Sequence, residues 1–160
     1  MKLKFFIFFI TIFWLQYCNH GLSPIPRPAG ISGIITYQNW PPPDSIKILK
    51  LVVFRNFPPG NIIEEVQSKR AIYYPTVLTE SLPQFVDSTE YRLALEPGVY
   101  EYIVIAQQYG EIIETDWRVV GQYDTTAADT LPSAITVLAD SILKDININV
   151  DFMNLPIQPF

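Results

Sequence analysis

The chain of 160 residues contains one cysteine, Cys18, and one histidine, His20, close together near its start. A thiol can be lipidated, can act with histidine as a nucleophile, or can bind zinc together with it. Because neither residue type occurs again, the rest of the chain cannot build a Ser-His-Asp triad, a Cys-His pair or a His/Cys zinc site. Its glycines are single and widely spaced, so no phosphate-binding loop is expected either. We therefore expect a non-enzymatic protein without cofactor or metal, in which Cys18 is the residue suited to modification.

The residues before Cys18 have the pattern of a signal peptide, which we assign to residues 1–17. Lys2 and Lys4 give a positive start, and residues 5–15 then form an uncharged apolar run. A membrane-spanning helix needs about 20 apolar residues, so this run is too short for a permanent transmembrane segment.

This segment resembles a bacterial lipoprotein signal, in which a cysteine after a short apolar core becomes the new N-terminus and is lipidated on its sulfur. Leu15 stands where that pattern has leucine, whereas Tyr17 stands where Gly, Ala or Ser is usual. The resemblance implies a cell-envelope protein held on a membrane, most simply the outer membrane, by lipidated Cys18. A periplasmic or secreted protein and an uncleaved anchor are the alternatives. Lipidation would also account for a lone cysteine, which cannot close an internal disulfide.

The charge balance is acidic. Removal of residues 1–17 takes Lys2 and Lys4 away and lowers the formal net charge from −5 to about −7. The basic residues are scattered singly, so the electrostatic attraction that drives binding to a phosphate backbone is missing. We expect no nucleic-acid partner.

Residues 18–30 form the lipidation site and a linker, and residues 31–160 form one domain. Pro24, Pro26 and Pro28 favour an extended stalk. The domain then alternates apolar and polar residues in short runs separated by Pro, Gly, Asn and Asp, which is typical of strands. The expected strands cover residues 31–37, 48–57, 91–96, 99–108 and 146–152, and residues 61–70 are a loop or a short helix. The fold class predicted is all-β, an antiparallel Greek-key β-sandwich of about seven strands.

Part of this pattern is similar to a known family. The stretches are Ile31-Ser-Gly-Ile-Ile-Thr-Tyr37, the hydrophobic strand that ends at Phe54, and Tyr91-Arg-Leu-Ala-Leu-Glu-Pro-Gly-Val-Tyr-Glu-Tyr-Ile-Val-Ile-Ala106. They resemble carboxypeptidase regulatory-like modules, which have a transthyretin-like (prealbumin-like) fold. In the Pro97-Gly98 turn, Pro sets φ, Gly accepts positive φ, and the following tyrosine is expected to pack across the sandwich. The resemblance implies a structural or binding module without catalysis of its own. The stretch 86–91 and the long insertion 61–84 depart from the family pattern.

Aromatic residues are the other functional signal. Trp40 lies in a Pro-rich stretch and Trp117 follows an acidic one, so both are expected at loop ends. Together with Tyr109 they could stack on a sugar, which makes a carbohydrate-binding module the alternative function; further tyrosines could join them (Tyr73, Tyr74 and Tyr123). The competing interpretation is that both tryptophans pack against the core.

Carboxylates allow two further hypotheses, both less favoured. A hydrolase would need two Asp or Glu residues close together in a cleft, and a single sequence does not give their separation in space. Asp124, Asp129, Asp140 and Asp145 cluster loosely along the chain and could bind calcium, but their spacing is not that of an EF-hand. Turn and surface positions are the expected role of these four residues.

Overall fold

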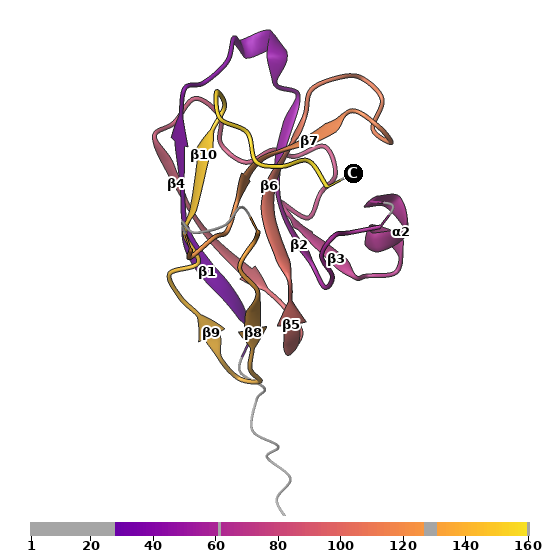
Figure 1. Ribbon diagram of the computed structural model, residues 1–160, viewed down its shortest axis with the longest axis vertical. Coiled ribbons are helices and arrows are strands. Elements are labelled where there is room, and N and C mark those ends of the chain that lie inside the picture. Colours follow the sequence, from indigo (N-terminus) through magenta and orange to yellow (C-terminus); the bar gives the residue numbers. More distant parts are fainter. Residues whose placement is uncertain (1–27, 61, 127–130, 160) are drawn as a thin grey trace, which may run out of the picture.

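The computed structural model describes residues 28–60, 62–126 and 131–159, which form an all-β domain (Figure 1). The expected signal segment, residues 1–17, and Cys18 lie outside these residues. Within the described ranges the strands are β1 (Gly30–Gln38), β2 (Ile48–Phe54), β3 (Ala71–Tyr74), β4 (Ser88–Ala94), β5 (Gly98–Tyr100), β6 (Tyr102–Gln108), β7 (Trp117–Gln122), β8 (Ile135–Val137), β9 (Ile142–Leu143) and β10 (Ile148–Asp151). Two short helices accompany them, the 3-10 helix η2 (Pro43–Ser45) and the α-helix α2 (Ile62–Gln67).

One large sheet contains most of the strands. Its order is β3-β2-β6-β7-β10-β1-β4, with β9 pairing beside β1, and β5 pairs with β8 in a separate two-stranded sheet. The large sheet curls, so that the group of β2, β6 and β3 lies opposite the group of β4, β1 and β10 (Figure 1). The result is a sandwich-like arrangement with the main core enclosed by the curl.

Period-two alternation explains this core. In β1, Ile31 and Ile35 are fully buried, and in β2 the buried inward residues include Leu51 and Val53. Side chains at alternate positions of a strand point to the same face, so both halves of the curled sheet send such residues inward. The remaining buried members of this main core come from all of the strands except β3 and β9, and from the loops: Tyr37, Ile46, Leu49, Leu82, Tyr91, Leu93, Leu95, Tyr100, Ile103, Ile105, Val120, Ile135, Val137, Ile146, Ile148 and Val150.

The sheet is mixed, so the antiparallel arrangement expected from the sequence is not what the structure shows. β1 runs parallel to β9 at Gly30 and Ile31, and again parallel to β10 from Ile35 to Gln38. Between these two pairings, the segment that leads from β9 to β10 passes very close to Gly33. A Cβ at Gly33 would overlap the Ile146 carbonyl. β9 and β10 therefore act as one interrupted strand beside β1, and that long-range pairing leaves no trace in local alternation.

The predicted strands all coincide with observed strands, with one interruption. The run expected at 99–108 is divided at Glu101, because β5 pairs with β8 whereas β6 pairs with β2 and β7. The amide of Glu101 donates instead to the Phe54 carbonyl oxygen at 3.1 Å. Residues 61–70, expected to be a loop or a short helix, contain α2. The strands β3, β7, β8 and β9 were not predicted, because they are short or lie in stretches rich in polar and turn residues.

The Pro97-Gly98 turn has the expected local geometry. Gly98 has a φ of +143°, a conformation that favours glycine. Tyr100 is fully buried in the main core and its hydroxyl donates to the Glu96 carbonyl oxygen at 2.9 Å. The guanidinium of Arg55 lies 4.3 Å from the centre of the Tyr100 ring, which ties this turn to the end of β2.

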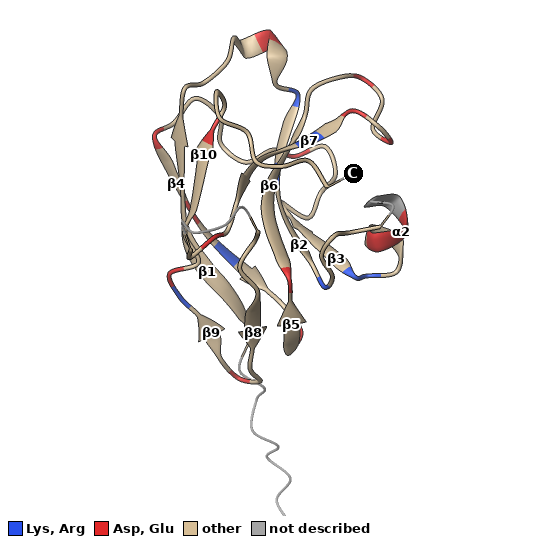
Figure 2. Ribbon diagram, viewed as in Figure 1, with Lys and Arg blue, Asp and Glu red and all other residues tan. Residues whose placement is uncertain are grey.

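Charged residues lie mainly in loops and at strand ends on the side of the molecule that Figure 2 shows. Blue and red positions are interspersed there and do not gather into a single basic surface. Among the described residues, no helix is both long enough and apolar enough to cross a membrane.

Candidate functional site

The half-sheet β3-β2-β6-β7 is buried on both of its faces. Almost every residue of β2 and every residue of β6 is buried, including those that point away from the main core. The outward residues form a second apolar cluster, whose buried members are Val52, Phe54, Ala71, Tyr102, Val104, Ala106 and Val119. A strand buried on both faces needs cover on both, and here the outer cover is supplied by α2 and by the loops after β3 and β6.

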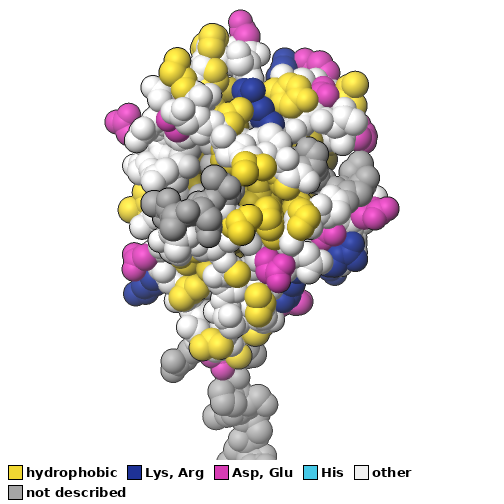
Figure 3. Space-filling model, in the orientation of Figure 1, with side chains coloured by type: hydrophobic (Ala, Val, Ile, Leu, Met, Phe, Trp, Pro, Cys, Tyr) yellow, Lys and Arg dark blue, Asp and Glu magenta, His cyan; other side chains and the backbone are white. Residues whose placement is uncertain are grey.

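This cover is incomplete and leaves a groove of about 280 Å³, which is the candidate functional site. Its apolar surface comes from the outer face of β2 and β6, through Val52, Phe54, Val104 and Ala106. Figure 3 shows hydrophobic side chains gathered near the centre of this face, beside the position of α2 in Figure 1. The volume is almost twice that of a cavity of about 150 Å³ that holds benzene, and it lies at the small end of ligand pockets.

The sides of the groove come from segments far apart in the sequence. Val66 of α2 and Tyr73 of β3 contribute on one side, and Ile113 and Trp117 contribute from the β6–β7 connection and the start of β7. Leu78, in the loop that follows β3, completes the apolar lining. Leu78 and Ile113 are both substantially exposed, so the groove opens to solvent between these loops.

A charge pair attaches α2 beside the groove. Glu65 is buried, and its carboxylate accepts hydrogen bonds from Arg70 Nε at 3.0 Å and from a terminal nitrogen of Arg70 at 3.1 Å. A bidentate arrangement of this kind fixes direction as well as distance. Glu65 raises the pKa of Arg70 through this hydrogen bond and its charge. Lys69, with a φ of +58°, adopts the left-handed conformation that commonly follows the end of a helix.

Lys50 is the least expected residue of the site. It occupies an outward position of β2 between apolar neighbours, lines the groove, and is only 2% exposed. Its Nζ donates to the carbonyl oxygens of Pro75 at 2.8 Å and Val77 at 2.6 Å, and lies 5.4 Å from the centre of the Tyr73 ring. Burial lowers the pKa of Lys50, and the charge of Glu80 partly opposes this shift.

The sequence itself indicates an unusual environment for Lys50. Residues 48–54 read Ile-Leu-Lys-Leu-Val-Val-Phe, so one lysine interrupts a strand that is otherwise fully apolar. A lysine in a strand buried on both faces must either reach solvent along its alkyl stem or find partners inside. Here it finds backbone carbonyls.

Trp117, one of the predicted contact residues, does line the groove. It is half-buried, packs against the outer cluster, and its indole nitrogen donates to the Ile113 carbonyl oxygen at 2.6 Å. It stands at the first position of β7 rather than in a loop. This hydrogen bond holds the 112–116 connection against the sheet and so shapes one wall of the groove.

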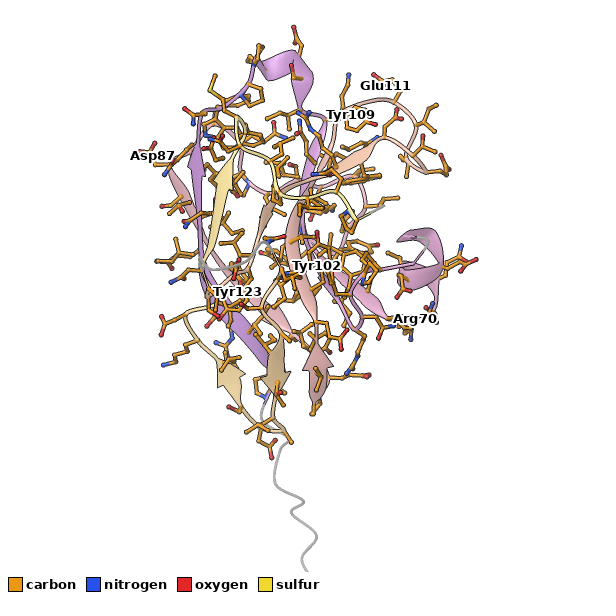
Figure 4. All side chains as sticks on the ribbon, viewed as in Figure 1. Arg70, Asp87, Tyr102, Tyr109, Glu111 and Tyr123 are labelled. Atoms are coloured by element: carbon orange, nitrogen blue, oxygen red, sulfur yellow. The ribbon has the colours of Figure 1, made fainter. Side chains whose placement is uncertain are left out.

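Tyr109 lies on the other side of the sheet from Trp117. Gln107 and Arg118 are paired across β6 and β7 and alternate with Gln108 and Trp117, so they point to the opposite face. Arg118 donates to Gln107 at 2.9 Å, and its guanidinium lies 5.7 Å from the centre of the Tyr109 ring. Tyr109 is 46% exposed, and Figure 4 shows it beside Glu111, away from Tyr102 at the centre of the molecule.

Trp40 packs against the main core. Its ring centre lies 4.8 Å from that of Tyr37, 5.0 Å from that of Phe85 and 4.7 Å from that of Phe152. Its indole nitrogen donates to the Val86 carbonyl oxygen at 3.0 Å. The three aromatic residues singled out in the sequence therefore occupy three separate environments and do not form one platform.

The aspartates considered for calcium have turn geometry where they are described. Asp124 accepts hydrogen bonds from the Thr126 amide at 2.8 Å and from Ser133 Oγ at 3.2 Å, which closes a loop. Asp140 and Asp145 have positive φ values, as turn residues often do, and Asp129 lies outside the described residues. Within residues 28–60, 62–126 and 131–159, no three His, Cys, Asp or Glu side chains are close enough together to hold a metal ion.

Comparisons of the chain with protein-family models, with curated proteins and with solved structures found no match.

Proposed function

We propose that the protein is a non-enzymatic binding module of the bacterial cell envelope and that its ligand occupies the outer groove. The observation that carries this proposal is the groove itself. An apolar space of about 280 Å³ stays open on the outer face of β2 and β6, although α2 and two loops are placed to cover that face. Leaving apolar surface open to water costs roughly 25 cal/mol for each Å², so an apolar ligand would gain by filling it.

The proposed place of action rests on Cys18. The apolar run after Lys2 and Lys4 and the position of Leu15 support lipidation of Cys18, and the proline-rich stretch up to residue 30 would separate the domain from a membrane. A relationship to carboxypeptidase regulatory-like modules is part of the same proposal, supported by the Pro97-Gly98 turn and by buried Tyr100. Modules of this kind act by binding or by mechanical support, and the open groove supports the first of these roles.

The alternative of carbohydrate binding now rests on Trp117 and Tyr109 separately. Trp117 and Tyr73 give the groove two aromatic walls, whereas Tyr109 with Arg118 offers an exposed ring on the opposite face. A glycan array compared between the wild type, Trp117→Ala and Tyr109→Ala tests both positions. Binding that survives both substitutions would remove the basis for this alternative.

The groove is tested with octan-1-ol, a neutral apolar probe that dissolves in water at millimolar concentration. In the isotope-labelled full chain, we expect amide shifts in the strand segment 104–106 and a shift of the Trp117 indole signal. Ala106 lies on the sheet surface that forms the floor of the groove, so Ala106→Leu places a larger side chain in the groove and should abolish these shifts. Ala94→Leu makes the same change at an exposed position of β4 and should leave them intact.

An unfolding transition measured for both variants shows whether the fold is retained. Ile113→Ala, a change at the exposed rim, provides a second variant that is not expected to alter the core and should weaken binding. No shifts up to the solubility of octan-1-ol, or shifts that persist unchanged in Ala106→Leu and Ile113→Ala, would contradict the proposal.

A further inference from the structure

The groove contains one buried positive charge without a carboxylate partner. The ion pairs found among the described residues join Lys47 with Glu111, Arg55 with Glu96 and Arg70 with Glu65, and none of them involves Lys50. An ammonium group has three donors, and the described residues provide acceptors for two of them, the carbonyl oxygens of Pro75 and Val77. The positive charge of Lys50 is therefore solvated by dipoles but not neutralised by contact.

Holding such a charge away from water is unfavourable unless something compensates for it. The lysine stem alone does not need the charge, because Met would fill a similar volume on this strand. One role for the ammonium is already visible: its two hydrogen bonds fix the loop at Pro75–Val77 beside the groove. The Tyr73 ring, 5.4 Å from Nζ at its centre, adds a favourable contact with the charge. The third donor still has no acceptor among the described residues, and no carboxylate there neutralises the charge by contact.

The charges near Lys50 limit which ligand could pair with its ammonium group. Glu80 acts on Lys50 through its charge without a contact, and Glu114 is the only carboxylate among the described residues that line the groove. Gln67 is the remaining polar lining residue and carries no charge. The rest of the lining is hydrocarbon or aromatic. A ligand with one negative charge near Lys50 would match this surface, whereas a second negative charge would be repelled by Glu114.

We infer that the ligand of the groove is an amphipathic monocarboxylate, a free acid whose carboxylate binds Lys50 and whose short apolar tail lies on Val104 and Ala106. This inference rests on the proposed function, because it assigns the chemical class of ligand to the same groove. The volume of about 280 Å³ restricts the tail to a short chain or a small ring system. Trp117 and Tyr73 provide flat walls for such a tail.

The matched probes are octanoate and octan-1-ol, which share a chain length and differ in the head group. We expect calorimetry on the full chain to give an affinity for octanoate at least about tenfold higher than for octan-1-ol. A hydrogen bond to a charged group changes binding affinity by about this factor. Lys50→Met should remove this preference, so that this variant binds the two probes with equal affinity. Lys47→Met, which removes an exposed lysine near the start of the same strand, should leave the preference intact.

A second measurement avoids mutation, in case Lys50→Met disturbs the loop that it supports. The carboxyl carbon of ¹³C-labelled octanoate bound to the wild type reports the ionisation of the head group. Contact with Lys50 should lower the pKa of bound octanoate below that of the free acid, whereas burial in the groove without that contact should raise it. A merely structural lysine would not produce the lowered value.

The outcomes separate the two proposals. Equal affinities for the two probes, or a raised pKa of bound octanoate, would overturn the monocarboxylate inference while binding of octan-1-ol still supports the groove. Failure of both probes to bind the wild type would overturn both. A tenfold preference that Lys50→Met abolishes, together with a lowered pKa, would support the assignment of the head group to Lys50.

Discussion

Arg70 and Glu65, five positions apart in the chain, are joined by two hydrogen bonds of 3.0 and 3.1 Å. Only residues 68–70 separate α2 from the start of β3. The carboxylate is buried and the guanidinium lies at the surface, below α2 in Figure 4. A helix as short as α2 is not stable by its own hydrogen bonds. Its position over the outer face of the sheet therefore depends on this pair and on the packing of Val66 against the outer cluster.

Glu65→Gln should loosen α2 without unfolding the domain, because the neutral amide cannot form the charged bidentate contact. We expect the amides of Ser68 and Lys69, which donate to carbonyl oxygens of this helix, to exchange about tenfold faster or more. Hydrogen exchange followed by mass spectrometry or NMR measures this change. The exposed pair of Lys47 and Glu111 is the control, and Lys47→Ala should leave exchange in α2 unchanged. Unaltered exchange in Glu65→Gln would show that packing alone holds the helix.

Two buried tyrosines should respond in opposite ways to loss of the hydroxyl. The Tyr91 hydroxyl donates to the Ile146 carbonyl oxygen at 2.6 Å, whereas the Tyr102 hydroxyl is buried without a partner among the described residues. Tyr91→Phe leaves a buried carbonyl without its donor and should lower the free energy of unfolding by about 1–2 kcal/mol. Tyr102→Phe removes an unsatisfied group and should leave stability unchanged or raise it by up to about 1 kcal/mol.

Urea unfolding at neutral pH compares the two variants directly, and each serves as the control for loss of ring polarity in the other. The Tyr102 ring keeps its contacts with Phe54 and Phe57, at centre distances of 5.7 and 4.9 Å, so packing should not change. A clear loss of stability in Tyr102→Phe would mean that its hydroxyl has a partner that the described residues do not include.

The local strand patterns were predictable from the sequence, because alternation depends only on which face of a strand is buried. β1, β2, β4 and β10 each show alternation or a β-branched run, and the Pro97-Gly98 turn has a definite chemistry. The parallel pairing of β1 with β10 was not predictable in the same way. It joins Ile35 to Ile148 across most of the domain, and nothing in either segment specifies the direction of its partner.

The groove was harder still to predict, because its lining comes from α2, four strands and two loops. Of its lining residues, the sequence pointed to Trp117 and, less directly, to Tyr73, as rings that could stack on a sugar rather than as parts of a groove wall. The isolated lysine in residues 48–54 could have indicated a special environment. The apolar residues around this lysine give no such indication, since the same residue types are equally suited to the main core.

Gly33 is expected to be the glycine that is least tolerant of substitution in β1. A Cβ at Gly33 would overlap the backbone carbonyl of Ile146, where the chain passes from β9 to β10. The backbone must move apart to accept Ala, at a cost of about 1–3 kcal/mol. Gly60→Ala is the matched control, because its nearest atom would be a side-chain oxygen of Glu65 at 3.4 Å.

Thermal or denaturant unfolding of Gly33→Ala and Gly60→Ala measures the difference. In Gly33→Ala the parallel pairing beside β1 should be weakened first. The Ile146 amide donates to the Ser32 carbonyl oxygen at 3.1 Å, so its hydrogen exchange should also become faster. Equal stability of the two variants would contradict the close crossing at Gly33.

Stability should fall at alkaline pH because of the buried tyrosines. Burial raises the pKa of Tyr91 and of Tyr102, whereas a tyrosine in the unfolded chain ionises near pH 10. Above about pH 10 the unfolded state therefore loses protons that the folded state keeps, and the free energy of unfolding decreases as pH rises towards the raised values. Lys50 has the opposite sign, because its lowered pKa adds stability as pH rises towards about 10.4.

Urea unfolding at about pH 9 and about pH 11 tests this balance, since the first lies below and the second above the tyrosine value for the unfolded chain. Tyr102→Phe should show a smaller loss of stability between the two, because one buried group no longer titrates. Tyr109→Phe, which alters an exposed ring, should lose as much as the wild type. A Tyr102→Phe curve parallel to that of the wild type would assign the alkaline loss to other groups.

Lipidation of Cys18 gives the protein its proposed place in the cell, and the intact mass of the protein extracted from membranes tests it. We expect the mass of residues 18–160 increased by a diacylglyceryl group and an acyl chain. Cys18→Ser removes the only thiol of the chain, so it should leave the precursor unprocessed at this position and abolish the mass increase. His20→Ala, two positions away, is the control and should be processed normally.

An inhibitor of the lipoprotein signal peptidase should likewise cause the precursor to accumulate. The departure at Tyr17 from the usual small residue makes slow processing the expected defect, and Tyr17→Ala should accelerate it. An unmodified mass that begins after residue 18 would contradict the anchor, because the cysteine would then have been discarded with the signal. The groove would in that case bind its ligand from a freely secreted domain, and the proline-rich stretch before residue 31 would no longer serve as a stalk.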